Sequence, residues 1–219
     1  MGCTESKRSG DASDPSIITK NMVESATKCF ISTEELDVLR KSGALVCILD
    51  CSVIVGPGEE PIFAYHREHI PGAKFLDLKL ARDLASPYPF MMPSKDYFVA
   101  VAKSLDIRKT HKVIVYDCQQ GGFANRGAFM IKAFGHPDVC VLDGGFGKWK
   151  AEGREVHSCK SVPTSDDFVY ELDASQVKSF EDIKDLSSSG ASQIIDARPA
   201  QGFAGGNIPG SVNIPAPMF

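Results

Sequence analysis

The chain has 219 residues, of which 43% are hydrophobic and 24% are charged, a composition typical of a folded globular protein. Its net charge of -4 at pH 7 argues against a nucleic-acid partner, because domains that bind nucleic acids usually carry a basic face. No apolar run approaches the roughly 18 residues of a membrane helix, and no apolar signal segment stands at the N-terminus, so we predict a cytoplasmic protein.

The seven cysteines are irregularly spaced and include no Cys-x-x-Cys pair. The sequence therefore predicts neither a metal site nor a thioredoxin-like redox motif, and we expect no cofactor. Cys47 and Cys140 lie within apolar runs and are expected to behave as small buried hydrophobic residues. Unpaired thiols of this kind fit a reducing compartment.

The first six residues, "MGCTES", match a lipidation pattern. After removal of Met1, Gly2 would be N-terminal, and Ser6 stands where the myristoylation pattern has Ser or Thr. One myristoyl chain binds a membrane only marginally, with a constant of about 10⁴ M⁻¹, so a palmitoyl chain on Cys3 would be needed to hold the protein there. The sequence thus predicts lipidation at Gly2 and Cys3 and contact with a membrane surface; the alternative is an unmodified tail.

A helix is predicted over residues 32–43, "STEELDVLRKSG", because Ser32 and Glu35 have the spacing of a capping box and Gly43 ends the pattern. The apolar run "LVCILD" at residues 45–50 follows and predicts a buried strand.

Two turns are predicted, each near a side chain that we expect to be structural. Within "YHREHIPGAKFLDL", residues 65–78, the Pro71-Gly72 pair predicts a turn. His69 is interpreted as a hydrogen-bonded structural residue, because no partner acid lies nearby in the sequence. The turn Asp143-Gly144-Gly145 leads into a helix that carries Trp149, which is expected in the core.

Four further elements are predicted within residues 94–143. Residues 94–107, "SKDYFVAVAKSLDI", have helical periodicity, and residues 112–117, "KVIVYD", form a buried strand. A helix at residues 124–136 and a strand at residues 139–143, "VCVLD", complete the series. These strands and a fourth run, "QIID" at residues 193–196, all end in aspartate.

Short apolar runs thus alternate with helical patterns, which is typical of βα units. The predicted fold class is α/β, with a parallel sheet flanked by helices on both faces. An internal repeat is also visible, because the helix, strand and loop of residues 32–78 return as a helix at 179–190, a strand at 193–196 and "FAGGNIPGSVNIPA" at residues 203–216. Four segments are therefore predicted: a disordered tail at 1–29, a complete domain at 30–157, a linker at 158–172 and a partial second domain at 173–219.

A specific signature supports this division. Tyr65 precedes His69-Ile70-Pro71-Gly72-Ala73, and the stretches "VIVYD", "FGH" and "VLDGGFGKW" follow in order. These residues resemble the rhodanese family, specifically the tandem-domain thiosulfate and 3-mercaptopyruvate sulfurtransferases. The resemblance covers a whole domain and the front part of a second one, and it implies a rhodanese-like fold with the second domain truncated.

The resemblance implies sulfur transfer through a cysteine persulfide. A donor such as thiosulfate or 3-mercaptopyruvate gives sulfur to a thiolate, and cyanide or a thiol removes it. In tandem members the reactive cysteine lies in the second domain, in a loop whose N–H groups stabilise the thiolate. Here the second copy ends before that loop, Asn207 replaces the signature histidine, and Gly202 replaces an expected arginine. Arg198 remains as a candidate substrate-binding residue.

The first-domain version of this loop is "DCQQGGFANR", residues 117–126. Asp117 aligns with the catalytic cysteine, as in the inactive first domain of the family, and Cys118 lies one residue out of register. Cys118 is the candidate catalytic residue, and Arg126, the first basic residue after it, is a candidate substrate-binding residue. An ionised Asp117 beside it would raise the thiol pKa, so the alternative is an unreactive loop cysteine.

A cysteine-phosphatase function is rejected on spacing, because a Cys-x5-Arg cradle would need arginine at position 124, which is Ala124. Three hypotheses remain. The chain is a sulfurtransferase acting through Cys118, or a non-catalytic rhodanese-fold module, lipid-anchored, that binds a protein or regulates a full-length relative. The third is a truncated gene product, because a second copy of about 50 residues is too small for an independent core.

Overall fold

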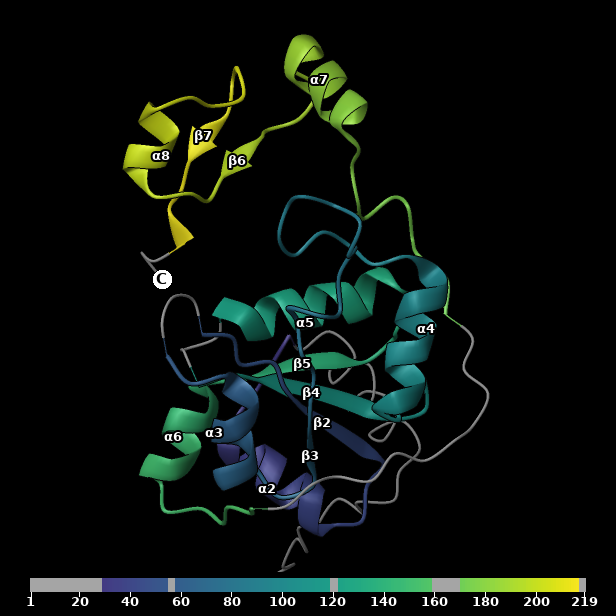
Figure 1. Cartoon of the computed structure of the whole chain (residues 1–219), viewed down its shortest axis with the longest axis vertical. Coiled ribbons are helices and arrows are strands. Elements are labelled where there is room, and N and C mark those ends of the chain that lie inside the picture. The colour runs from purple at the N-terminus through teal and green to yellow at the C-terminus, as the bar shows by residue number, and fades with distance from the viewer. Residues whose placement is uncertain (1–28, 55–57, 119–121, 159–169, 217–219) are drawn as a thin grey trace, which may run out of the picture. The chain divides into compact units, whose positions relative to one another are not determined.

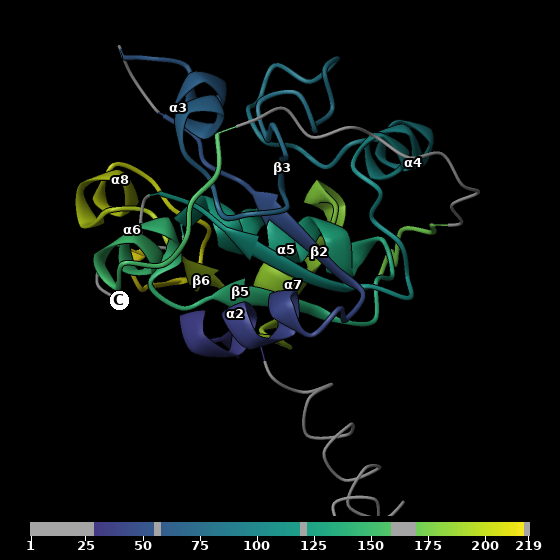
Figure 2. The same ribbon diagram turned by 90° about the horizontal axis from the view of Figure 1, so that it is seen from below.

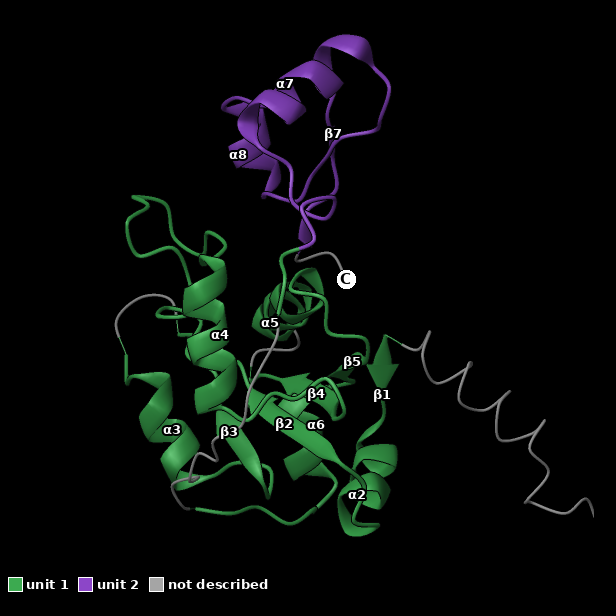
Figure 3. Ribbon diagram, turned by 90° about the vertical axis from the view of Figure 1, so that its right-hand side faces the viewer, with its two compact units in different colours: residues 1–172 green, residues 173–219 purple. Residues whose placement is uncertain are grey.

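The computed structural model describes residues 29–54, 58–118, 122–158 and 170–216. The chain forms two compact units, residues 1–172 and 173–219, which Figure 3 colours separately. Gly2 and Cys3, the predicted lipidation residues, and most of the predicted linker lie outside the described residues. Within the described part of the chain, no helix is long and apolar enough to cross a membrane.

The first unit is built on a five-stranded parallel sheet with the strand order β1-β5-β4-β2-β3 (Figure 3), and Figure 2 shows β2, β3 and β5 of this sheet from below. The three strands at its centre are those predicted from apolar runs, which confirms them. The edge strands β1 and β3 were not predicted, because two and three residues are too few to show an apolar pattern. The strands are β1 (Phe30–Ile31), β2 (Val46–Asp50), β3 (Ala73–Phe75), β4 (Lys112–Tyr116) and β5 (Val139–Leu142).

Helices cover both faces of this sheet, as predicted (Figure 1). Successive side chains of β4 point to opposite faces, so Ile114 packs with residues of α2, α3 and α6, whereas Val113 and Val115 pack with residues of α4 and α5. Trp149 is fully buried on the first of these faces, as expected. The helices are α2 (Thr33–Lys41), α3 (Pro61–Arg67), α4 (Lys95–Ser104), α5 (Gly122–Ala133) and α6 (Gly145–Ala151).

The capping pattern at the start of α2 is confirmed. The hydroxyl of Ser32 accepts the N–H of Glu35 at 3.1 Å, and the Glu35 carboxylate accepts the N–H of Ser32 at 2.8 Å. Helix α3 was not predicted, because it has only seven residues and its N-cap residue makes no side-chain hydrogen bond. Its first residue is Pro61, which is favoured at the first position of a helix.

The described residues of the second unit form two helices and a two-stranded parallel sheet. The predicted helix at 179–190 is confirmed, with a capping box at Ser179 and a left-handed Gly190 at its end. None of the described residues 173–216 is buried. The elements are α7 (Phe180–Ser189), β6 (Ile195–Asp196), α8 (Ala200–Ala204) and β7 (Val212–Asn213).

Candidate functional site

The candidate site lies where β2, β4 and β5 end, at the carboxyl edge of the parallel sheet. This edge is the usual place for ligands in open α/β sheets, because the loops that follow neighbouring strands meet there. The loops bring together Ser52 after β2, Asp117 and Cys118 after β4, and Gly145 after β5.

The carboxylate of Asp117 caps the N-terminus of α5. The side chain is fully buried, and one carboxylate oxygen accepts the N–H groups of Phe123 and Ala124 at 2.9 and 2.8 Å. A carboxylate is stabilised there, because the first N–H groups of a helix have no partner within the helix and carry a partial positive charge. A second anion at this helix end would have to compete with Asp117 for the same two donors.

Backbone contacts fix Asp117 from the β5 side. Its carbonyl oxygen accepts the N–H of Phe146 at 3.0 Å. Gly145 passes so close that an added Cβ would lie 2.6 Å from the same oxygen, and its φ of +56° also favours glycine. The predicted turn at residues 143–145 is thus confirmed, and it holds the end of β4 in place.

Cys118 is exposed, and its backbone N–H donates to the hydroxyl of Ser52 at 3.0 Å. The N–H of Ser52 in turn donates to the Asp50 carboxylate at 2.9 Å. Ser52 was not singled out from the sequence, although its position two residues after a predicted strand was the available signal. Residues 119–121 lie outside the described residues, so the thiol of Cys118 is placed beside a loop of which only the two ends are described.

Three other cysteines are unsuited to nucleophilic chemistry. Cys47 and Cys140 are buried, as predicted, and so is Cys51. Burial raises the pKa of Cys47 to about 12 and raises the pKa of Cys51 well above its ordinary value. Because the thiolate is the nucleophile, these buried thiols stay inert at neutral pH. Among the described cysteines, exposure leaves Cys118 and Cys29 as the accessible sulfur atoms.

Arg126 lies on α5, in the same unit as Cys118, and its guanidinium is engaged with the loop before α4. One terminal nitrogen donates to the carbonyl oxygen of Phe90 at 2.7 Å, and the other lies 3.1 Å from the sulfur of Met92. Burial lowers the pKa of Arg126. A substrate anion would have to displace the contact with Phe90, and the substrate-binding role of Arg126 stays a prediction.

Arg198 belongs to the second unit. Its guanidinium forms a bidentate pair with the Asp196 carboxylate, with its closest contact at 2.6 Å, and donates to the carbonyl oxygen of Gly206 at 2.7 Å. These residues line a pocket of about 630 Å³ together with Asn207. Arg198 and Cys118 belong to different compact units, and the substrate-binding role of Arg198 also stays a prediction.

The signature histidine is structural, as predicted. His69 is buried, donates from Nδ1 to the carbonyl oxygen of Tyr65 at 2.7 Å and stacks on the Tyr65 ring with centroids 4.3 Å apart. The Tyr65 hydroxyl donates to the carbonyl oxygen of Ala73 at 2.7 Å, which links α3 to β3. Among the described residues, no group of three or more His, Cys, Asp or Glu side chains is placed to hold a metal ion.

Comparisons with known proteins agree with this architecture. The model of the rhodanese-like domain matches residues 32–152 and 179–219. The chain is 36% identical over 188 residues to thiosulfate sulfurtransferase from Gallus gallus, covering 81% of this chain and 65% of that protein. It is 38% identical over 168 residues to 3-mercaptopyruvate sulfurtransferase from Rattus norvegicus, covering 71% of this chain and 57% of that protein.

Among solved structures, the chain resembles SseA from Escherichia coli, described as a 3-mercaptopyruvate sulfotransferase of the rhodanese fold. The TM-score is 0.80 at 28% identity, over 86% of this chain and 75% of that one. The chain thus spans less than two thirds of the length of the two curated relatives named above. Its fold, its two matched segments and its relatives show that it belongs to the rhodanese-like domain family.

Proposed function

We propose that the chain acts in sulfur transfer, as a thiosulfate or 3-mercaptopyruvate sulfurtransferase. The observation that carries this proposal is its similarity to both kinds of sulfurtransferase over 71–81% of its length. The proposed nucleophile is Cys118, the exposed thiol at the carboxyl edge of the sheet. Sulfane sulfur would pass through a persulfide on this residue to a thiol or to cyanide.

The proposed reaction has two steps. The Cys118 thiolate attacks the outer sulfur of thiosulfate, a new S–S bond forms, and sulfite leaves with the electron pair of the broken bond. Cyanide then attacks the outer sulfur of the persulfide, which releases thiocyanate and restores the thiolate. The chain's own contribution is to present the sulfur at the surface while Ser52 holds the Cys118 backbone at 3.0 Å.

The test is thiocyanate production by the full chain from thiosulfate or 3-mercaptopyruvate with cyanide as acceptor. We expect turnover in the wild type and a loss on the order of 10³-fold or more in Cys118→Ser, because the nucleophile is removed. The matched control is Cys29→Ser, which changes the other exposed cysteine of the described chain and should leave the rate unchanged. Equal rates in wild type and Cys118→Ser would refute Cys118 as the nucleophile.

The contact between Asp117 and α5 favours a second candidate, a non-catalytic rhodanese-fold module that binds a protein or regulates a full-length relative. A reactive cysteine needs an electropositive surrounding, and Asp117 already occupies two N–H donors at the end of α5. This candidate predicts a folded chain that produces no thiocyanate above the level of Cys118→Ser from either donor.

The domain organisation is part of the same proposal. A complete rhodanese-like domain would occupy residues 30–157, and a partial second repeat would occupy 173–219, joined by a linker at 158–172 after a tail at 1–29. The family model supports this, because it matches one segment on each side of the proposed linker.

We also propose that the chain is cytoplasmic and is held at a membrane surface by acyl chains on Gly2 and Cys3. The pattern "MGCTES" supports it. In cells, Gly2→Ala should move the protein from the membrane fraction to the supernatant, and Cys3→Ser should do so in part, because two acyl chains bind much more firmly than one. Wild-type protein found only in the supernatant would contradict the anchor.

A further inference from the structure

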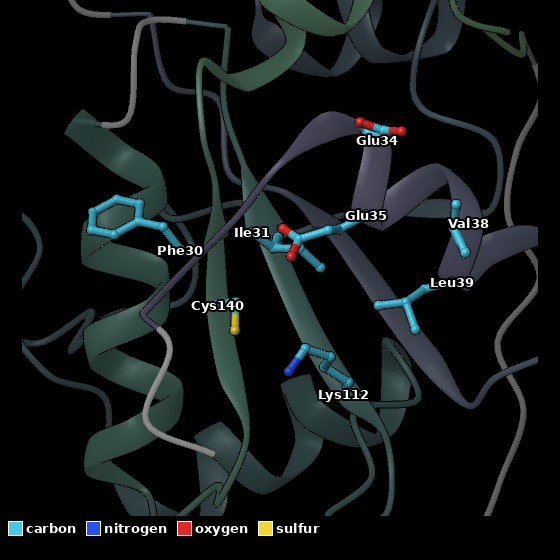
Figure 4. Close-up of a pocket in the computed structure, with 8 residues that line it drawn as sticks. All are labelled: Phe30, Ile31, Glu34, Glu35, Val38, Leu39, Lys112 and Cys140. Carbon is cyan, nitrogen blue, oxygen red and sulfur yellow. The ribbon is translucent and has the colours of Figure 1, made fainter. Parts of the chain in front are cut away.

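A pocket of about 400 Å³ lies beside β1 and α2, among residues that no step of the sulfur-transfer proposal uses. Its volume falls in the range of roughly 300–1,000 Å³ that is typical of sites for small organic ligands. Figure 4 shows Phe30 on one side and Val38 and Leu39 on the other, with Cys140 and Lys112 between them.

The walls of this pocket are largely apolar and accessible. Phe30 and Val38 are 53% and 62% exposed, which is unusual for such large apolar side chains when they gather at one place. Ile31 and Cys140 are buried behind them. An elongated hydrocarbon chain would cover the exposed side chains and remove their apolar surface from water.

The charges around the pocket select against a free fatty acid. The carboxylates of Glu34 and Glu35 border it, and they would repel a ligand carboxylate (Figure 4). Lys112 already pairs with the Asp138 carboxylate, at 2.8 Å. The pocket therefore fits an acyl chain whose head is uncharged, as in an amide, and whose neighbouring residues carry a net positive charge.

We propose that this pocket binds the acyl chain attached to Gly2 of the same molecule, an inference that rests on the N-terminal acylation proposed above. An acyl chain on Gly2 is joined by an uncharged amide, and the charged residues that follow it, Glu5, Lys7 and Arg8, leave one net positive charge, complementary to Glu34 and Glu35. Phe30, a wall of the pocket, is also the first residue of the first described strand.

The tether makes this binding intramolecular. Gly2 is joined to Phe30 by fewer than 30 residues, and at roughly 3.3 Å per extended residue the connection is long enough to return the N-terminus to the pocket. A short tether gives an effective concentration of about millimolar, so even weak intrinsic affinity fills the pocket. The pocket and the membrane then compete for one acyl chain, and filling the pocket lowers membrane binding.

The experiment uses the full chain co-expressed with an N-myristoyltransferase, with acylation verified by mass spectrometry. Hydrogen–deuterium exchange should be slower in α2 of the acylated wild type than in Gly2→Ala, which carries no acyl chain. Val38→Glu adds a charge to the pocket wall; it should remove this protection and raise sedimentation with phosphatidylcholine vesicles several-fold. The matched control is Leu84→Glu, at a residue that is 56% exposed and outside this pocket, and it should behave as the wild type.

Equal exchange in acylated wild type and Gly2→Ala would overturn the proposal without recourse to any pocket variant. Equal vesicle binding by acylated wild type and Val38→Glu would also overturn it. Protection that appears only with dimer formation in analytical ultracentrifugation would assign the acyl chain to the pocket of a second copy and overturn the intramolecular form. If Gly2 is not acylated in its own cells, the proposed anchor fails, whereas co-expression still decides whether the pocket takes an acyl chain.

Discussion

In the first unit His69 donates to the carbonyl oxygen of Tyr65 at 2.7 Å, and in the second unit the Asn207 amide donates to the carbonyl oxygen of Phe203 at 3.2 Å. The two pairs stand at the same place in the predicted repeat. Asparagine therefore replaces the signature histidine and keeps its i to i−4 hydrogen bond. The substitution that marked the second copy as divergent in sequence leaves this local contact in place.

The strands of the two predicted copies also correspond. Leu76 donates to the carbonyl oxygen of Asp50 at 2.8 Å, and Ile214 donates to that of Asp196 at 2.9 Å. Burial is where the copies differ, because Ile70 is fully buried whereas Ile208 is 40% exposed. In the first unit β2 lies between β3 and β4 under helices, whereas among the described residues β6 pairs with β7 alone. Local pattern forms the turn and the strand pair, and neighbouring elements supply the core.

The largest expected effect comes from truncating the same residue of each copy. Ile70→Ala should lower the free energy of unfolding of the first unit by about 2–5 kcal/mol, because it leaves a cavity in a closed core. Ile208→Ala should change the free energy of unfolding of the first unit by less than about 0.5 kcal/mol. Urea unfolding followed by the fluorescence of Trp149, the single tryptophan, reports on the first unit. Similar losses in both variants would show that the two copies share one core.

The next effect tests a feature of the first unit, the carboxylate that caps α5. Asp117→Ala should lower the free energy of unfolding by about 2–3 kcal/mol, because one buried and one half-buried N–H group lose their carboxylate acceptor. The control is Asp143→Ala, which breaks a surface pair with Lys148 and should cost less than about 1 kcal/mol. The same urea titration measures both variants, and equal losses would contradict the capping role.

The smallest effect separates two equivalent aspartates by pH. Burial raises the pKa of Asp50 above 3.8 in the folded first unit. The contribution of Asp50 to stability is therefore full below about pH 3.8 and is lost as the pH rises through the higher pKa of the folded state. The hydrogen bond from Arg198 lowers the pKa of Asp196, so that contribution is present above 3.8 and is lost as pH falls through the lower folded value. Carboxyl-carbon NMR titration measures both midpoints.

Two variants sharpen this measurement. Ser52→Ala removes a side-chain hydrogen bond that lowers the Asp50 pKa, so the Asp50 midpoint should rise further. Arg198→Gln should return the Asp196 midpoint toward 3.8. Midpoints of Asp50 and Asp196 on the same side of 3.8 in the wild type would break the contrast between the copies.

Local sequence signals were sufficient for the regular elements that carry strong patterns. The capping box at Ser32 and the apolar runs of β2, β4 and β5 gave the first helix and the central strands, because those signals act within a few residues. The edge strands β1 and β3 were not predicted, because they are defined by partners far away in the chain. Helix α3 was not predicted, because it is short and lacks a side-chain cap.

The candidate site followed the same division. The loop after β4 could be located from the sequence. The apolar run ends at Asp117 and Cys118 and is followed by glycines, which marks the carboxyl edge of a sheet. Two contacts could not be predicted: the hydrogen bonds from the first N–H groups of α5 to Asp117, and the hydrogen bond from Arg126 to Phe90. Each depends on the direction of a side chain and on a loop that the fold places beside it.

By itself the sequence determined the α/β class, the signature around His69 and the positions of the cysteines, and it predicted the repeat. Those properties rest on periodicity, turn residues and residue type, which act locally. The tertiary structure decided which thiols are accessible, that the first copy has a closed core and the described second copy has none, and that Phe30 and Val38 face one pocket. Burial and cavities arise only when distant segments pack together.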